Sequence, residues 1–116
     1  MSENPLKTKS YTFAIRIINL YKFLTSEKKE FVMSKQVLRS GTGIGALICE
    51  AEFGQSKADF RSKMSMALKE ANETIYWLSL LKDTDYIDLK MYESLVKDAR
   101  ELTAMLVATV KTTKPL

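Results

Sequence analysis

Residues 60–81 read FRSKMSMALKEANETIYWLSLL, and they predict the architecture more clearly than any other segment. Apolar or small side chains return there at alternating spacings of four and three residues. They are Phe60, Met64, Ala67, Ala71, Thr74, Leu78 and Leu81. A repeat of about 3.5 residues keeps one face of a helix against near-parallel neighbours. The segment therefore predicts a long helix within a helical bundle.

Similar helical spacing appears on both sides of this segment. Together the apolar stripes predict four helices, over residues 10–25, 34–53, 57–82 and 89–112. Ser34, Ser56 and Asp88 are the predicted N-caps, because their side chains can accept hydrogen bonds from the first free N–H groups. Gly54 follows the second helix, where a left-handed residue is common.

The connections between these segments are short, and no proline lies between Pro5 and Pro115. Short connections place helices that follow each other in sequence antiparallel to each other. No β-type alternation of useful length appears. We therefore expect residues 1–116 to form one all-α domain, an up-down-up-down antiparallel four-helix bundle.

The charged residues show a mild basic excess and a complete lack of histidine. Eighteen Lys and Arg stand against fourteen Asp and Glu, which gives a net charge of +4. Without histidine the chain cannot form Ser-His-Asp or Cys-His sites, or the Glu-x-x-His metal sites of carboxylate bundles. We therefore expect no enzymatic activity, no catalytic residue, no metal and no cofactor.

Cys49 is the single cysteine and excludes an intrachain disulfide. Its apolar surroundings, residues 46–49, predict a small buried core side chain. The apolar and glycine run over residues 43–49 is far below the roughly 20 residues of a membrane span. The polar start of the chain also lacks the apolar segment of a signal peptide. These features predict a cytoplasmic protein without a membrane segment.

Gly41, Gly43 and Gly45 form the most unusual local feature. A phosphate-binding loop is one interpretation, but the spacing fits neither the Gly-x-Gly-x-x-Gly nor the Gly-Lys-Ser/Thr pattern. Mid-helix glycines cost about 1 kcal/mol each relative to alanine, so another interaction must offset the loss. We therefore expect Gly41 and Gly45, one turn apart, to allow close packing of a second helix.

Charged residues on the second and third helices predict a structural ion-pair network. With a turn centred near Gln55, Arg39 lies level with Glu70 and Glu73, which predicts salt bridges between them. The same register places two carboxylates beside two cations nearer the turn. The carboxylates are Glu50 and Glu52, and the cations are Lys57 and Arg61.

Two segments are too apolar for the surface of a small monomer. Residues 75–81 and 104–110 carry apolar side chains on more than one helix face. A helix of that kind faces either a large core or a partner. We therefore expect a homo-oligomer, with Tyr76 and Trp77 as interface candidates. The same aromatic pair could instead bind another protein, which makes the chain an interaction or scaffold module.

Several cations are candidates for contact with RNA or DNA phosphates. They are Lys28, Lys29, Lys35, Lys57, Arg61 and Lys63. A solvated charged face is the usual alternative explanation. A more remote alternative is a small helical enzyme that binds an anionic substrate with Lys35, Arg39 and Arg61, as chorismate mutases do. That enzyme would need several cations that converge on one pocket.

Two motifs resemble a known family. The first is SKQVLRSGTGIGA at residues 34–46, followed by Glu50 and Ala51, and the second is KEANETIYWL at residues 69–78. Both are similar to motifs of the small bacterial proteins that are encoded within intervening sequences of large-subunit ribosomal RNA genes. Some members of that family carry a ribosomal-protein name. Gly43 and Leu47 stand where the family favours Ser and Asn, so polar contacts of those side chains are absent here.

The resemblance covers nearly the whole chain and implies a four-helix protomer. It implies assembly into a ring-like homopentamer. It also relates the chain to the accessory proteins of diversity-generating retroelements, which act beside a reverse transcriptase and associate with nucleic acid. The resemblance thus implies an RNA-associated protein whose exact role is unknown.

Overall fold

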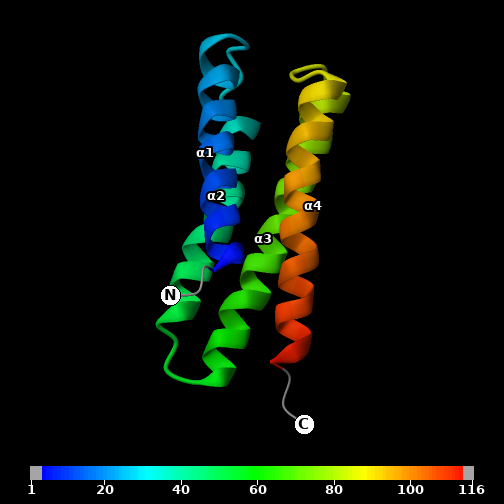
Figure 1. Cartoon of the computed structure of the whole chain (residues 1–116). Coiled ribbons are helices and arrows are strands. Elements are labelled where there is room, and N and C mark those ends of the chain that lie inside the picture. The colour runs from blue at the N-terminus through cyan, green and yellow to red at the C-terminus, as the bar shows by residue number, and fades with distance from the viewer. Residues whose placement is uncertain (1–3, 114–116) are drawn as a thin grey trace.

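The computed structural model describes residues 4–113 and contains four helices and no strand in that range. The helices are α1 (Pro5–Ser26), α2 (Met33–Glu52), α3 (Lys57–Asp83) and α4 (Leu89–Thr112) (Figure 1). The bounds of α2, α3 and α4 lie within one residue of the predicted ones. The prediction for α1 was wrong at its start, which is Pro5 instead of Ser10.

The four helices form an elongated body with principal extents of 48 × 25 × 20 Å. Each helix packs against the next one in sequence, and α1 also contacts α4. The α1–α2 and α3–α4 connections lie at one end, and the α2–α3 turn lies at the other (Figure 1). No helix in the described range has the length and hydropathy that a membrane span requires.

The α3 part of the core follows the predicted repeat. Met64, Ala67, Ala71, Thr74, Leu78 and Leu81 of α3 are all buried. Phe60, at the start of that repeat, is partly exposed. The largest fully buried side chains of the other helices are Phe13, Ile17, Leu24, Val37, Ile44, Ile48, Val96, Leu102 and Leu106. Burial of side chains of this size is the main favourable term in folding.

The early start of α1 has a local cause in Asn4 and Pro5. The Asn4 side chain accepts a hydrogen bond from the Lys7 N–H at 3.2 Å, and Pro5 occupies the first turn. Proline suits that position because it has a helical φ and lacks an N–H that would be left free. The cap therefore adds a turn ahead of the apolar stripe.

Glu30, and not Ser34, caps the start of α2. The Glu30 carboxylate accepts hydrogen bonds from the N–H groups of Val32, Met33 and Ser34, at 3.2, 3.0 and 2.7 Å. Ser34 is buried inside the first turn, so its predicted role as N-cap was wrong. A carboxylate that satisfies three of these N–H groups takes the place of a capping hydroxyl.

The other two predicted caps are confirmed, and the predicted role of Gly54 is wrong. Ser56 Oγ accepts from the Asp59 N–H at 3.0 Å, and Asp88 Oδ1 accepts from the Met91 N–H at 2.8 Å. No glycine of the described chain has a positive φ. A Cβ at Gly54 would lie 3.0 Å from Asp59 Oδ2 and 3.1 Å from the Ala51 carbonyl oxygen, so this glycine avoids tight contacts and does not provide a left-handed backbone.

Candidate functional site

Helix α1 lies directly over the glycines of α2. A Cβ built at Gly41 would lie 2.7 Å from Ile17 Cγ1, and one at Gly45 would lie 3.3 Å from Ser10 Oγ. Residues 41–45 are helical throughout, so their N–H groups bond within the helix and do not form a phosphate-binding loop. The glycines therefore serve helix packing at these two positions.

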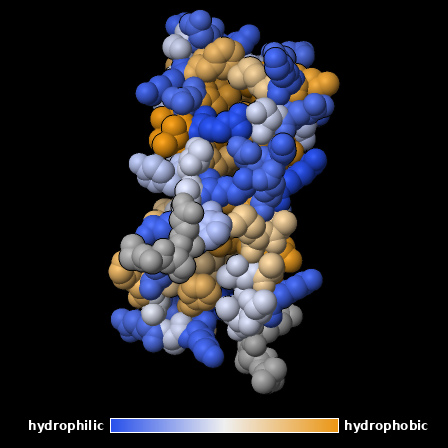
Figure 2. All heavy atoms as spheres, in the orientation of Figure 1, coloured by the Kyte–Doolittle hydropathy of each residue, from blue (hydrophilic) through white to orange (hydrophobic). Residues whose placement is uncertain are grey.

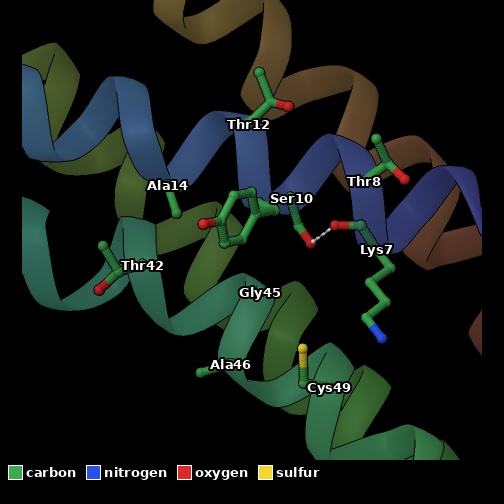
Figure 3. Close-up of a pocket in the computed structure, with 10 residues that line it drawn as sticks. Lys7, Thr8, Ser10, Thr12, Ala14, Thr42, Gly45, Ala46 and Cys49 are labelled. Atoms are coloured by element: carbon green, nitrogen blue, oxygen red, sulfur yellow. Dashed lines mark hydrogen bonds between the residues drawn. The ribbon is translucent and has the colours of Figure 1, made fainter.

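A groove of about 420 Å³ runs between α1 and α2 (Figure 3). Small side chains make it hollow, and a few hydroxyl groups and one lysine stand around it. Its lining consists of Lys7, Thr8, Ser10, Tyr11, Thr12, Ala14, Thr42, Gly45, Ala46 and Cys49. Cys49 is exposed, so the prediction of a buried core cysteine was wrong. Apolar grooves of this size can hold a large side chain of a partner or a small molecule.

An apolar stripe on the outer face of α1 continues the groove. Tyr11, with 69% of its surface exposed, is followed by the exposed Ile15 and Ile18. Spacings of four and three residues place all three on one helix face. The sequence analysis missed this stripe. The signal was present, since residues 11–18 carry apolar side chains on more than the one face that the core needs.

On the other side of α2, Arg39 contacts both of the carboxylates named as its partners. Its Nη1 lies 3.2 Å from each carboxylate oxygen of Glu70, and its Nη2 forms an ion pair with Glu73. Trp77 Nε1 donates to Glu73 Oε2 at 3.0 Å, and the ring of Tyr76 meets the Trp77 ring edge-on at 5.2 Å between centroids. The network therefore connects the charge pairs to the aromatic pair.

The two carboxylates near the end of α2 have partners other than those predicted. Glu50 pairs with Lys63 at 3.3 Å, and Glu52 pairs with Lys7 of α1 at 3.0 Å. The hydrogen bond from Lys7 lowers the pKa of Glu52, and the bond to Glu52 raises the pKa of Lys7. Neither carboxylate forms an ion pair with Lys57 or Arg61 in the described chain, and for Glu52 the reason is that α1 reaches this end and supplies a cation.

The cations named as phosphate contacts divide between the two ends of the body. Lys28 and Lys29 lie in the α1–α2 connection with Lys35 in the first turns of α2. Lys57, Arg61 and Lys63 lie in the first turns of α3, at the opposite end. Lys35, Arg39 and Arg61 therefore do not converge on one pocket, which removes the main support for the anion-binding enzyme.

The rest of the described surface is mixed in character. The face seen in Figure 2 mixes hydrophilic and hydrophobic side chains. Tyr76 is 57% exposed, whereas Trp77 is half-buried. Within residues 4–113 no three His, Cys, Asp or Glu side chains gather closely enough to hold a metal ion.

None of the curated proteins compared with the chain matches it. A solved crystal structure is similar over the whole fold, with a TM-score of 0.91 and 59% sequence identity. The match covers 91% of this chain and 98% of the other. That structure is described as a protein with unknown function from the S23 ribosomal protein family, from Bacteroides thetaiotaomicron.

A family model matches residues 3–108, which include all of α1, α2 and α3 and most of α4. The matched range contains both motifs on which the resemblance rests, at residues 34–46 and 69–78. It also contains the glycines of the α1–α2 contact and the carboxylates that bind Arg39. The chain belongs to the 23S rRNA-intervening sequence protein family.

Proposed function

We propose that this chain is a non-enzymatic helical-bundle protein that associates with RNA as a homo-oligomer in the cytoplasm. One observation carries the RNA association. Lys57 and Arg61 form no salt bridge within residues 4–113, while the nearby Glu50 and Glu52 are neutralised by other lysines. Unpaired cations one helical turn apart suit contact with successive phosphates.

We infer an up-down-up-down antiparallel bundle for the protomer. The pairing of side chains supports it, because residue numbers rise on one helix as they fall on its partner. On α2 and α3, Arg39 pairs with Glu73 and Glu50 with Lys63. On α1 and α4, Lys9 pairs with Glu101 and Arg16 with Asp98.

We also propose the ring-like homopentamer that the family resemblance implies. A ring of five copies needs two different faces on each subunit, because head-to-tail contacts close the ring. Two separate outer faces carry exposed apolar side chains, around Tyr11 on α1 and around Tyr76 on α3. Five copies would also bring five basic patches into one assembly, each from a chain of net charge +4, and this would raise the affinity for RNA.

A protein-interaction module is the second candidate function. The groove between α1 and α2 favours it, because the hollow is continuous with the exposed stripe of Tyr11, Ile15 and Ile18. If the groove is not closed by a second subunit, an external helix with a large apolar side chain would fit it. Retention of groove accessibility in the assembled oligomer would favour this function.

The test is the affinity for fluorescent RNA and DNA at several salt concentrations, with the oligomer mass measured by light scattering. We expect the affinity to fall steeply with salt. Lys57→Gln with Arg61→Gln should weaken binding and flatten the salt dependence. Lys90→Gln with Lys97→Gln, which removes the same charge from exposed sites on α4, is the matched control. Absence of RNA binding at 50 mM salt would overturn the RNA association. An oligomer mass equal to that of one chain would overturn the proposed homopentamer.

A further inference from the structure

We propose that the α2–α3 turn binds single-stranded RNA, with an unpaired base stacked on the Phe53 ring and neighbouring phosphates held by Lys57 and Arg61. This inference rests on the proposed RNA association and names the kind of RNA and the contact. The site comprises residues 53–61, at the end of the body opposite the α1–α2 connection (Figure 1). We call it the Phe53 turn.

The Phe53 ring is the most exposed large apolar side chain in the described chain, with 83% of its surface accessible. Its neighbours along the turn are polar, since Glu52, Gln55 and Ser56 are all exposed. A subunit or protein interface usually has a continuous apolar centre, as the Tyr11 stripe and its groove provide. A single ring among polar and charged side chains suits base stacking better.

The charges around the ring favour an anionic partner. Lys57 and Arg61 lie one turn apart on α3, and neither has a salt-bridge partner within residues 4–113. Asp59, the remaining acidic group of the turn, lies against the backbone of Gly54. Glu50 is paired with Lys63, and Glu52 is paired with Lys7. The turn is therefore left with two cations that have no ion-pair partner in the described chain and one carboxylate, so its net charge is positive.

A protruding ring also discriminates between single strands and duplexes. In an A-form duplex both faces of every internal base are covered by the bases above and below it, so a side chain cannot stack there without breaking the helix. In a single strand the base faces are accessible, and each aromatic contact is worth about 1–3 kcal/mol, or roughly five- to 150-fold in affinity. The Phe53 turn should therefore prefer unpaired RNA.

The experiment compares the affinities of the full chain and its variants for oligo-uridine and for a blunt-ended RNA duplex without a loop, of equal charge. Phe53→Leu keeps an apolar side chain but removes the ring, and should weaken oligo-uridine binding about tenfold with little effect on the duplex. Phe53→Tyr should retain wild-type affinity. Phe31→Leu is the matched control, because Phe31 is also exposed, at 54%, but lies in the connection at the other end.

The outcomes separate this inference from the proposed function. Salt-dependent RNA binding by the wild type with no loss in Phe53→Leu would overturn the stacking site and leave the RNA association standing. No RNA binding by the wild type would overturn both. If Phe53→Leu lowers the mass of the oligomer, the Phe53 side chain is a contact between subunits, and the inference is overturned. Circular dichroism checks that the variants remain helical.

Discussion

Helix α2 meets α1 closely at two glycines, whereas midway along its contact with α3 it forms ion pairs and a buried hydroxyl pair. Toward α1 it presents Gly41 and Gly45, where a single added carbon would collide with Ile17 or press on Ser10. Toward α3 it presents Arg39, with its ion pairs to Glu70 and Glu73, and the buried Ser40 hydroxyl, which is hydrogen-bonded to Thr74. One helix therefore carries two interfaces of different chemistry.

This difference predicts which of the two contacts tolerates amino-acid substitutions. A contact that depends on missing side-chain volume fails when one methyl group is added, because the packed interior cannot make room. A contact between partly exposed charges is weakened by solvent and salt, and water can solvate the remaining charge when one partner is lost. Substitutions on the α1 side of α2 should therefore cost more than substitutions on the α3 side.

The largest effect is expected at Gly41. Gly41→Ala should be less stable than Gly43→Ala by about 1–3 kcal/mol, because only the first places a Cβ 2.7 Å from a buried side chain. At Gly43 the nearest atom is Glu70 Cγ at 3.7 Å, an ordinary contact, so alanine there should stabilise the helix by about 1 kcal/mol. Urea unfolding at one fixed protein concentration measures both. Equal free energies of unfolding for the two variants would contradict the claim that close packing against α1 requires glycine at position 41.

The next effect concerns Glu30, which caps α2 at its α1 end. Burial raises the pKa of Glu30, but hydrogen bonds from the Ser34, Met33 and Val32 N–H groups outweigh it and leave the pKa below its usual value of 4.5. A lowered folded pKa gives stability that is present above the unfolded pKa and is lost as the pH falls through the folded one.

Glu30→Gln should therefore cost about 1 kcal/mol at pH 7, the usual value of a cap. It should also remove part of the loss of stability below about pH 4.5, the usual pKa of Glu. Unfolding curves between pH 7 and pH 3 measure both terms. Glu27→Gln, an exposed neighbour, is the control. A wild-type pH profile in Glu30→Gln would show that the carboxylate does not stabilise α2.

The sequence predicts the helices and cores well where one periodic pattern dominates. The repeat of residues 60–81 predicts α3, and Ser56 and Asp88 predict the starts of α3 and α4, because caps and stripes are local features. Arg39 lies near Glu70 and Glu73 because the short α2–α3 turn fixes the register of two neighbouring helices.

The errors arise where contacts between distant segments decide. The cap by Glu30 is an exception, because its carboxylate binds N–H groups only two to four residues further along the chain. Glu52 binds Lys7 because α1 extends to Pro5 and reaches the far end of α2. Cys49 is exposed because close packing at Gly45 leaves a groove beside it. The exposure of Phe53 likewise depends on how the turn is oriented, so periodicity could not identify it.

A smaller effect is expected on the α3 side, at the hydroxyl pair. Thr74 Oγ1 lies 3.0 Å from Ser40 Oγ and also donates to the Glu70 carbonyl. Thr74→Val should cost about 1 kcal/mol, since Ser40 keeps only a long contact to the Val37 carbonyl at 3.5 Å. Adding Ser40→Ala should recover part of that loss, because both partners are then apolar. A further equal loss in the double variant would contradict the pairing.

The smallest effect is expected at Arg39, whose side chain is 52% exposed. A double-mutant cycle of Arg39→Gln and Glu73→Gln should give a coupling of about 0.2–1 kcal/mol that shrinks in 1 M salt. Glu73 also accepts a hydrogen bond from Trp77, so Trp77→Phe with Glu73→Gln is a second cycle from the same carboxylate. That coupling should change less with salt, because the Trp77 donor is uncharged and half-buried. If the Arg39 coupling instead exceeds the cost of Gly41→Ala, charge and not shape would set the stability of α2, and the contrast between its two faces would be reversed.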